Sequence, residues 1–297
     1  MQYDVAIIGG SYAGLSAGLQ LARARQSVLV LDTGARRNRF AQHSHGFLTQ
    51  DGADPAAIAA TARAQLRAYG TVSWLDARAE RASVVEGGFL LSAQQVPAIL
   101  ARKLILATGV IDQLPEVPGL AERWGRSVFH CPYCHGYELQ QKPLGVLASS
   151  PLSLHHALML PDWGPTTLFL NGAFTPDDAQ LQQLQQRGVA IEDGLIREIS
   201  GERAVMVMQD GRSIALEGLF TLTRTRVASD IAAQLGCEFE AGPTGDFIKT
   251  DATRETSVPG VFACGDAARA AGSLALAVGD GVMAGTAAHR ALIFGQA

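Results

Sequence analysis

The first forty residues alternate between short apolar runs and turns in the order of a β-α-β unit. The apolar run Asp4–Ile8 leads into the small-residue turn Gly9–Gly14, after which small and apolar residues recur at helical spacing through Ala24. A second apolar run, Ser27–Leu31, ends at Asp32. Short apolar runs bounded by turn residues are typical of buried strands. The pattern therefore predicts a strand, a helix and a second strand.

The same alternation recurs further along the chain. Apolar runs at Leu104–Ala107, Leu144–Leu147 and Thr167–Leu170 predict three more buried strands. The segment Thr256–Asp266 contains a turn, a short strand and a Gly-Asp pair, and small residues then predict a helix over Leu274–Ala288. Strands that alternate with helices indicate an α/β chain.

The turn after the first strand has the composition of a dinucleotide-binding turn. Gly9 and Gly14 occupy the outer positions of a G-x-G-x-x-G pattern, Ser11 replaces its middle glycine, and Asp32 follows Gly9 by 23 residues. Glycines let backbone N–H groups at the helix start face a pyrophosphate, and an acid about 20 residues further on binds ribose hydroxyls. We expect Gly9, Ser11, Ala13, Gly14 and Asp32 to bind a dinucleotide. An incidental glycine turn is the alternative.

Composition and charge narrow the functional classes. The 297 residues, 47% of them hydrophobic, suffice for two domains with separate cores. A net charge of -4 leaves no basic stripe for nucleic acid, and no apolar run approaches the roughly 18 residues of a membrane span. The chain leads directly into a strand without a basic leader or cleavage site, so we expect a cytoplasmic enzyme.

Two of the four cysteines, Cys131 and Cys134, lie in a Cys-Pro-Tyr-Cys-His string that ends at His135. A close pair can cycle between dithiol and disulfide and so carry two electrons. Similar strings attach c-type haem or supply half of a zinc site, and the pair could be structural. Haem attachment belongs to exported proteins, and Cys237 and Cys264 stand alone, without the spacing of zinc ligands. We therefore predict a redox pair.

Four segments appear in the order found in a known family. Asp4–Asp32, Leu104–Gly109, the Cys131/Cys134 pair and Pro259–Asp266 resemble the corresponding segments of the low-molecular-weight thioredoxin reductases. The resemblance covers most of the chain. It implies an FAD-dependent enzyme with two Rossmann-like domains, which works as a homodimer.

In that family the FAD-binding domain is discontinuous in sequence. The resemblance implies an FAD domain over residues 1–113 and 244–297, with a smaller central domain over 114–243 that carries the redox disulfide. Asp266 would bind the ribityl and phosphate region, and the helix near Leu274 would stabilise the reduced flavin through its dipole. The FAD contacts implied outside the first turn are Thr108, Gly109, Gly265, Asp266 and Ala275.

The central domain departs from the family pattern. Thioredoxin reductases have there a second glycine-rich turn and a basic stretch for NADPH, whereas this chain has Ala148–Ser153 after the strand. Pro151 removes one backbone donor, and from Asn171 onward no arginine or lysine occurs before Arg187. We therefore expect weak or absent NADPH binding.

Two further polar clusters carry weaker signals. His43-Ser44-His45 has no carboxylate or cysteine nearby in the sequence, so we predict loop residues over the flavin and assign no metal. The segment Arg36–Asn38 could reach an adenosine phosphate or form an exposed basic turn.

The Cys-x-x-Cys-His-Gly string resembles that of dithiol oxidases, a thioredoxin reductase-like branch that closes disulfides in gliotoxin, holomycin and romidepsin. By resemblance, Cys134 would approach the flavin and Cys131 would engage substrate sulfur. A helix that begins at the pair would lower the thiol pKa. His135 would relay protons near a pKa of about 6.5, unless it is only a helix cap.

We therefore expect an FAD-dependent dithiol oxidase that uses no NADPH and acts on a small-molecule dithiol. One alternative is a disulfide reductase of a thioredoxin-like protein, fed by NADPH or by a ferredoxin-type or flavin-type donor. The other is a flavin-binding redox sensor without turnover.

Overall fold

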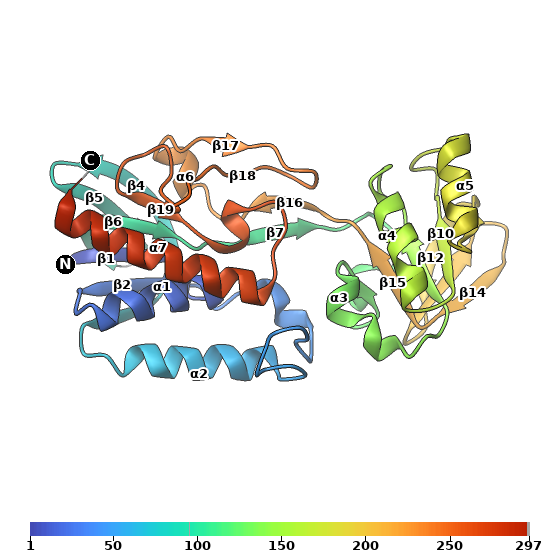
Figure 1. Ribbon diagram of the computed structural model, residues 1–297, viewed down its shortest axis with the longest axis horizontal. Coiled ribbons are helices and arrows are strands. Elements are labelled where there is room, and N and C mark those ends of the chain that lie inside the picture. The colour runs from blue at the N-terminus through green and yellow to red at the C-terminus, as the bar shows by residue number, and fades with distance from the viewer. Residues whose placement is uncertain (95, 296–297) are drawn as a thin grey trace. The chain divides into compact units, whose positions relative to one another are not determined.

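The computed structural model describes residues 1–94 and 96–295 (Figure 1). Its contacts divide the chain into two compact units, each built on a parallel sheet, which agrees with the predicted α/β class. The first unit consists of residues 1–39, 54–111 and 225–297, and the second of residues 40–53 and 112–224.

Residues 225–243 belong to the first unit, although the sequence analysis placed them in the central domain. The reason is helix α6 (Ile231–Gln234), because Ile231 and Leu235 are buried in the core of the first unit. The chain changes units within β7 (Val110–Gln113) and β16 (Arg224–Val227), which pair in a two-stranded sheet.

Residues 40–53 belong to the second unit, whereas the sequence analysis placed them in the FAD domain. Phe40 packs so closely on Gly125 of the second unit that a Cβ there would lie 2.7 Å from the Phe40 side chain. His45 in turn pairs with Glu138. No local sequence pattern indicates these contacts.

The sheet of the first unit has a parallel layer in the order β3-β2-β1-β6-β19, and β5 and β4 extend β6 as an antiparallel meander. The predicted runs at Asp4–Ile8 and Ser27–Leu31 correspond to β1 and β2. The strands are β1 (Gln2–Ile8), β2 (Val28–Asp32), β3 (Val72–Asp76), β4 (Ala79–Val85), β5 (Gly88–Ala93), β6 (Val96–Leu106) and β19 (Val261–Ala263).

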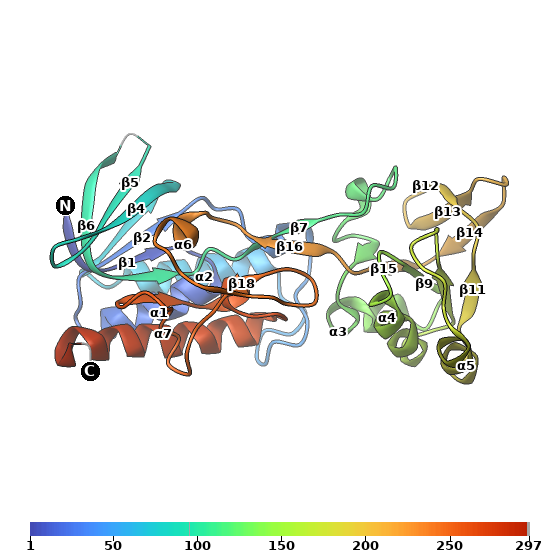
Figure 2. The same ribbon diagram turned by 90° about the horizontal axis from the view of Figure 1, so that it is seen from above.

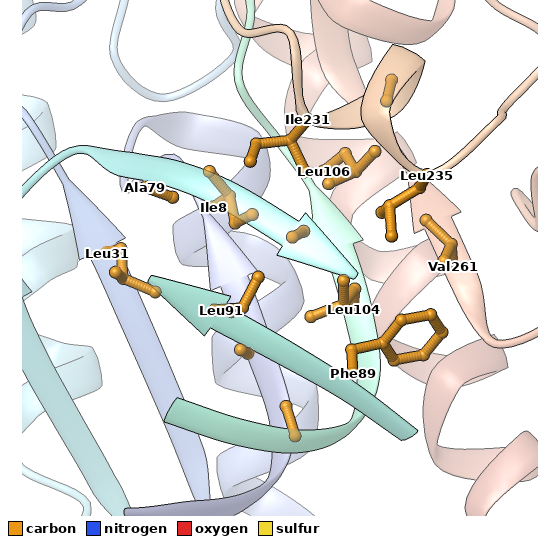
Figure 3. Close-up of a cluster of buried hydrophobic side chains, with 14 of the residues drawn as sticks. Ile8, Leu31, Ala79, Phe89, Leu91, Leu104, Leu106, Ile231, Leu235 and Val261 are labelled. Carbon is orange, nitrogen blue, oxygen red and sulfur yellow. The ribbon is translucent and has the colours of Figure 1, made fainter. Parts of the chain in front are cut away.

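Alternate side chains of β1 enter separate cores on the two faces of this sheet. Val5 and Ile7 pack under α1 (Tyr12–Arg23) and α7 (Leu274–Phe294), which lie side by side (Figure 2). Ile8 faces the other way and joins the cluster around Leu91, Leu104 and Val261 that Figure 3 shows. Helix α2 (Pro55–Arg67) follows Asp54, whose side chain caps it.

The second unit has a five-stranded parallel sheet in the order β11-β10-β9-β15-β8 and an antiparallel meander, β12-β13-β14. Its strands are β8 (Val128–Phe129), β9 (Leu144–Leu147), β10 (Thr166–Phe169), β11 (Ala190–Glu192), β12 (Ile196–Ser200), β13 (Ala204–Met208), β14 (Ser213–Leu216) and β15 (Gly218–Thr221). Its helices are α3 (Pro132–His135), α4 (Ser153–Met159) and α5 (Asp178–Gln186).

Short elements complete the described chain. They are β17 (Phe239–Glu240), β18 (Phe247–Ile248) and the 3-10 turns η1 (Arg37–Phe40), η2 (Ala121–Arg123), η3 (Tyr137–Leu139), η4 (Leu160–Asp162) and η5 (Gly265–Ala268). None of the helices in residues 1–94 and 96–295 has both the length and the apolar character needed to cross a membrane.

Candidate active site

The turn between β1 and α1 is closed by contacts that only glycine permits. Gly9 has φ +106°, and a Cβ there would lie 2.2 Å from the carbonyl oxygen of Ala107. A Cβ at Gly14 would lie 1.8 Å from the carbonyl oxygen of Gly9. The Gly10 N–H donates to Asp32 Oδ1 over 3.0 Å, so the acid at the end of β2 also holds the turn. This geometry presents the start of α1 to a bound phosphate.

Polar atoms around this turn lack a partner among the described residues. They are Thr108 Oγ1, Asn38 Oδ1 and Arg36 Nε, all buried. The Asn38 amide donates to the Tyr12 hydroxyl over 3.1 Å, which places Asn38 beside the first residue of α1. Buried polar groups are normally satisfied, so the three atoms fit a cofactor rich in hydroxyls and phosphates. The residues present therefore fit FAD. Asn38, whose role the sequence analysis left open, becomes a candidate FAD contact.

Asp266, at the start of η5, pairs with an arginine that the sequence analysis did not connect to it. Arg37 Nη1 lies 2.8 Å from Asp266 Oδ2, and both side chains are about one quarter exposed. Beyond Asp266, Ser273 caps α7, and its side chain accepts from Leu276 N–H. The first turn of α7 carries no acidic side chain, so its N-terminal dipole is not offset there.

A buried ion network lies behind this part of the first unit. Asp280 on α7 is 3% exposed and pairs with Arg254 Nη2 at 2.8 Å and Arg269 Nε at 3.2 Å. Sequence reasoning missed this network because its members are far apart in the chain. It joins the segment before β19, the end of η5 and α7, which are the elements around Asp266.

The two cysteines outside the motif are buried thiols in the first unit. Burial raises the pKa of Cys264 to about 12, helped by the negative charge of Asp280. Burial also raises the pKa of Cys237, which lies 3.5 Å from Thr256 Oγ1. Because the thiolate is the nucleophile, neither residue is suited to thiol chemistry.

Cys131 and Cys134 form a disulfide in the second unit. Cys131 is the N-cap of α3, and Cys134 lies inside this four-residue helix with its N–H donating to the Cys131 carbonyl. The predicted helix thus begins at the pair, but it has only four residues, so its dipole is small. No group of three or more histidine, cysteine or acidic residues able to hold a metal occurs in the described part of the chain.

His135 differs from the sequence-based expectation. Its ring stacks on Phe129 with centroids 4.3 Å apart. Burial, followed by the positive charges of His130 and His45, lowers the pKa of His135 to about 4. The pKa of His135 thus lies below the value of about 6.5 that the sequence analysis used, because burial disfavours the imidazolium, and its part in proton transfer stays a prediction.

His45 reaches the neighbourhood of the disulfide from the segment 40–53. Its Nδ1 lies 3.4 Å from Glu138 Oε1 and 3.7 Å from Asp51 Oδ1, and its side chain is 18% exposed. The interaction with His135 shows that the two imidazoles are close enough to influence each other. Glu138 follows Cys134 by only four residues, and sequence reasoning missed it because nothing local links it to His45.

The turn after β9 is closed by its own side chains. Ser149 N–H donates to Ser153 Oγ over 3.0 Å, and the N–H groups of Ser153, Leu154 and His155 donate to carbonyls of Ser150–Leu152. Four backbone donors in and just after the turn, those of Ser149, Ser153, Leu154 and His155, thus have partners within this segment.

Residues that follow the next strand of the second unit also have partners within the protein. Asn171 Oδ1 accepts from Ile196 N–H, and Arg187 binds the Leu158 carbonyl and Asp162. Gly145 serves packing, because a Cβ there would lie 2.5 Å from the Leu216 side chain.

A parallel-sheet unit with a dinucleotide turn and a second unit with a close disulfide define a flavoprotein disulfide oxidoreductase. The model of the pyridine nucleotide-disulphide oxidoreductase family matches residues 3–290. The chain belongs to this family, whose members use a flavin.

Comparisons with individual proteins agree with the family. An oxidoreductase from Agrobacterium tumefaciens has 56% identity, covers 100% of both chains and superimposes with a TM-score of 0.97. The crystal structure of HlmI has 35% identity and a TM-score of 0.91, over 99% of this chain and 93% of that one. Thioredoxin reductase sirT of Leptosphaeria maculans is 34% identical over 96% of this chain and 92% of its own. The predicted relationship to thioredoxin reductase-like flavoproteins is thereby confirmed.

Proposed function

We propose that this protein is an FAD-dependent dithiol oxidase that takes electrons from a small dithiol and does not use NADPH. The observation that carries the proposal is the turn after β9, where Ser153 Oγ and neighbouring carbonyls accept hydrogen bonds from the N–H groups of Ser149, Ser153, Leu154 and His155. A nucleotide would have to break these contacts and would meet no basic side chain in the turn. NADPH binding therefore lacks both donors and charge complementarity.

We infer that Cys131 and Cys134 exchange electrons with the dithiol, with Cys131 meeting substrate sulfur and Cys134 facing the cofactor. FAD, when bound, supplies the two-electron acceptor, and oxygen or another oxidant regenerates it. The residues proposed to hold FAD are Gly9, Ser11, Ala13, Gly14, Asp32, Asn38, Thr108, Gly109, Gly265, Asp266 and Ala275.

A second candidate is a disulfide reductase that uses NADPH and acts on a thioredoxin-like protein. The Leptosphaeria relative is named a thioredoxin reductase, which favours this candidate. It requires a nucleotide site in the second unit that is built without the usual turn.

We also infer a homodimer and a cytoplasmic location. One face of α7 packs on α1, while the opposite face exposes Leu276, Val282, Met283 and Ile293. A helix that is apolar on both faces normally has a partner on each, and a second copy of this chain is the proposed partner. A Val282→Glu/Met283→Glu variant should sediment as a monomer. The cytoplasmic location rests on the small number of cysteines.

Oxygen consumption tests the proposed activity. The FAD-loaded protein should consume oxygen in the presence of a small dithiol such as dithiothreitol and should show no added consumption with NADPH. Rapid NADPH oxidation coupled to disulfide reduction would favour the second candidate. A yellow protein that turns over neither substrate would favour the redox sensor.

A further inference from the structure

The second unit contains an imidazole–carboxylate pair that the proposed function has not used. His45 and Glu138 approach to 3.4 Å, from segments 93 residues apart in sequence. The segment that carries His45 is held in place by a bridge between Ser44 and Ala53 and by Gly46 N–H donating to Asp51 Oδ1. His45 is therefore a largely buried imidazole directly beside a carboxylate, two groups that can both bind a proton.

The exchange at the disulfide releases a proton that must be bound. A dithiol loses two protons when it becomes a disulfide, and only one of them remains on the enzyme when one cysteine is a thiol and the other a thiolate. His135 adjoins Cys134, but its pKa of about 4 means that it does not retain a proton at neutral pH. The proton is then either released to solvent or bound by another group near the pair.

We propose that the His45–Glu138 pair takes up this proton. This inference rests on the proposed exchange at Cys131 and Cys134. One substrate thiolate attacks Cys131 and breaks the disulfide, and Cys134 leaves as a thiolate. The second substrate thiolate then displaces Cys131, so that the substrate is oxidised by two electrons and the pair is reduced by two. One proton stays on Cys131, and the other passes to His45, where Glu138 holds the imidazolium.

The charges around His45 define what each substitution should do. The groups around His45 are the carboxylates of Glu138 and Asp51, at 3.4 and 3.7 Å, and the imidazoles of His43 and His135. In this arrangement a protonated His45 stabilises a thiolate at the pair. Loss of His45 or Glu138 should therefore raise the apparent thiol pKa.

Glu138→Gln separates proton uptake from a simple charge effect. If Glu138 acted only as a negative charge near the cysteines, its removal would stabilise the thiolate and lower the thiol pKa. If it holds the imidazolium, its removal raises the thiol pKa. The two accounts predict opposite signs.

The test is the pH dependence of alkylation in the reduced, FAD-loaded protein. Iodoacetamide is added between pH 5 and pH 9, and peptide mapping follows Cys131 and Cys134. We expect His45→Gln and Glu138→Gln to move the profile upward by on the order of one pH unit. The matched control is His43→Gln on the same segment, whose ring lies 6.3 Å from that of His45, and which should leave the profile unchanged.

A profile that is unchanged or shifted downward in Glu138→Gln overturns the proposal, and so does an equal shift in His43→Gln. If His45→Gln does not fold, the sign for Glu138→Gln decides alone. The alkylation profile does not depend on the direction of electron flow, so failure of the dithiol oxidase activity would be recognised separately, in the oxygen-consumption assay.

Discussion

The two units have similar parallel sheets, but the turns that follow β1 and β9 differ in their close contacts and hydrogen bonds. In the first unit, Gly9 and Gly14 permit backbone contacts that any Cβ would prevent, and Thr108 and Asn38 keep buried oxygens without a partner among the described residues. In the second unit, Ser149 and Ser153 satisfy the turn internally. We therefore propose that a parallel sheet alone does not make a nucleotide site. The first turn has unpartnered buried polar atoms beside it, whereas residues 148–153 of the second unit contribute no such side-chain atom.

Substitution of the motif cysteines should have the largest effect on activity. It should abolish electron transfer in the second unit without changing FAD binding in the first. Cys131→Ser and Cys134→Ser should each lower dithiol oxidation by about 10³-fold or more, because the disulfide cannot form. Both variants should keep their FAD. In the Cys131→Ser variant the remaining Cys134 thiolate should give a long-wavelength absorbance band with the flavin. Cys237→Ser is the control, and near-normal turnover in either motif variant would mean that the pair is structural.

The glycine turn is the next most sensitive place. Gly14→Ala puts a Cβ 1.8 Å from the Gly9 oxygen, so we expect a loss of stability of about 1–3 kcal/mol and a protein that purifies without most of its FAD. Ser150→Ala in the second turn should leave FAD content unchanged. Absorbance at 450 nm against protein concentration measures both. Equal FAD content in the two variants would contradict the assigned cofactor site.

The buried ion network of the first unit should contribute more to the free energy of unfolding than an exposed ion pair of the second unit. Asp280→Asn leaves two arginines partly buried without their carboxylate and should destabilise the protein by about 3 kcal/mol in urea unfolding. The exposed Arg187–Asp162 pair of the second unit provides the comparison, and Asp162→Asn should change stability by less than about 1 kcal/mol. A small effect at Asp280 would show that the network does not support the elements around Asp266.

Acid should weaken the second unit more than the first. Burial lowers the pKa of His156 to about 4, and His156 is 5% exposed. Because the folded pKa lies below the unfolded value, this histidine contributes stability above pH 6.5 that is lost as the pH falls toward 4, on the order of 2 kcal/mol. Hydrogen exchange at pH 7 and pH 4.5 should show the loss in the second unit, and His156→Leu should reduce it. Equal loss in both units would be inconsistent with this assignment.

The sequence predicted features that depend on local patterns. Apolar runs located β1, β2 and β9, and the short spacing of Cys131 and Cys134 predicted their partnership. It did not predict the pairing of Arg37 with Asp266 or of His45 with Glu138, since each joins residues that only the fold brings together. The sequence also could not predict the lowered pKa of His135, because this pKa depends on burial of the side chain against neighbours such as Phe129.

The central claim is that the second unit has lost its nucleotide site and kept its disulfide, and anaerobic stopped-flow absorbance tests it most directly. The oxidised enzyme is mixed with micromolar NADPH or with a small dithiol, and the flavin band is followed. We predict bleaching by the dithiol that requires Cys131 and Cys134, and little or no bleaching by NADPH. Complete bleaching by NADPH within a second would contradict the account and make the disulfide reductase the better description.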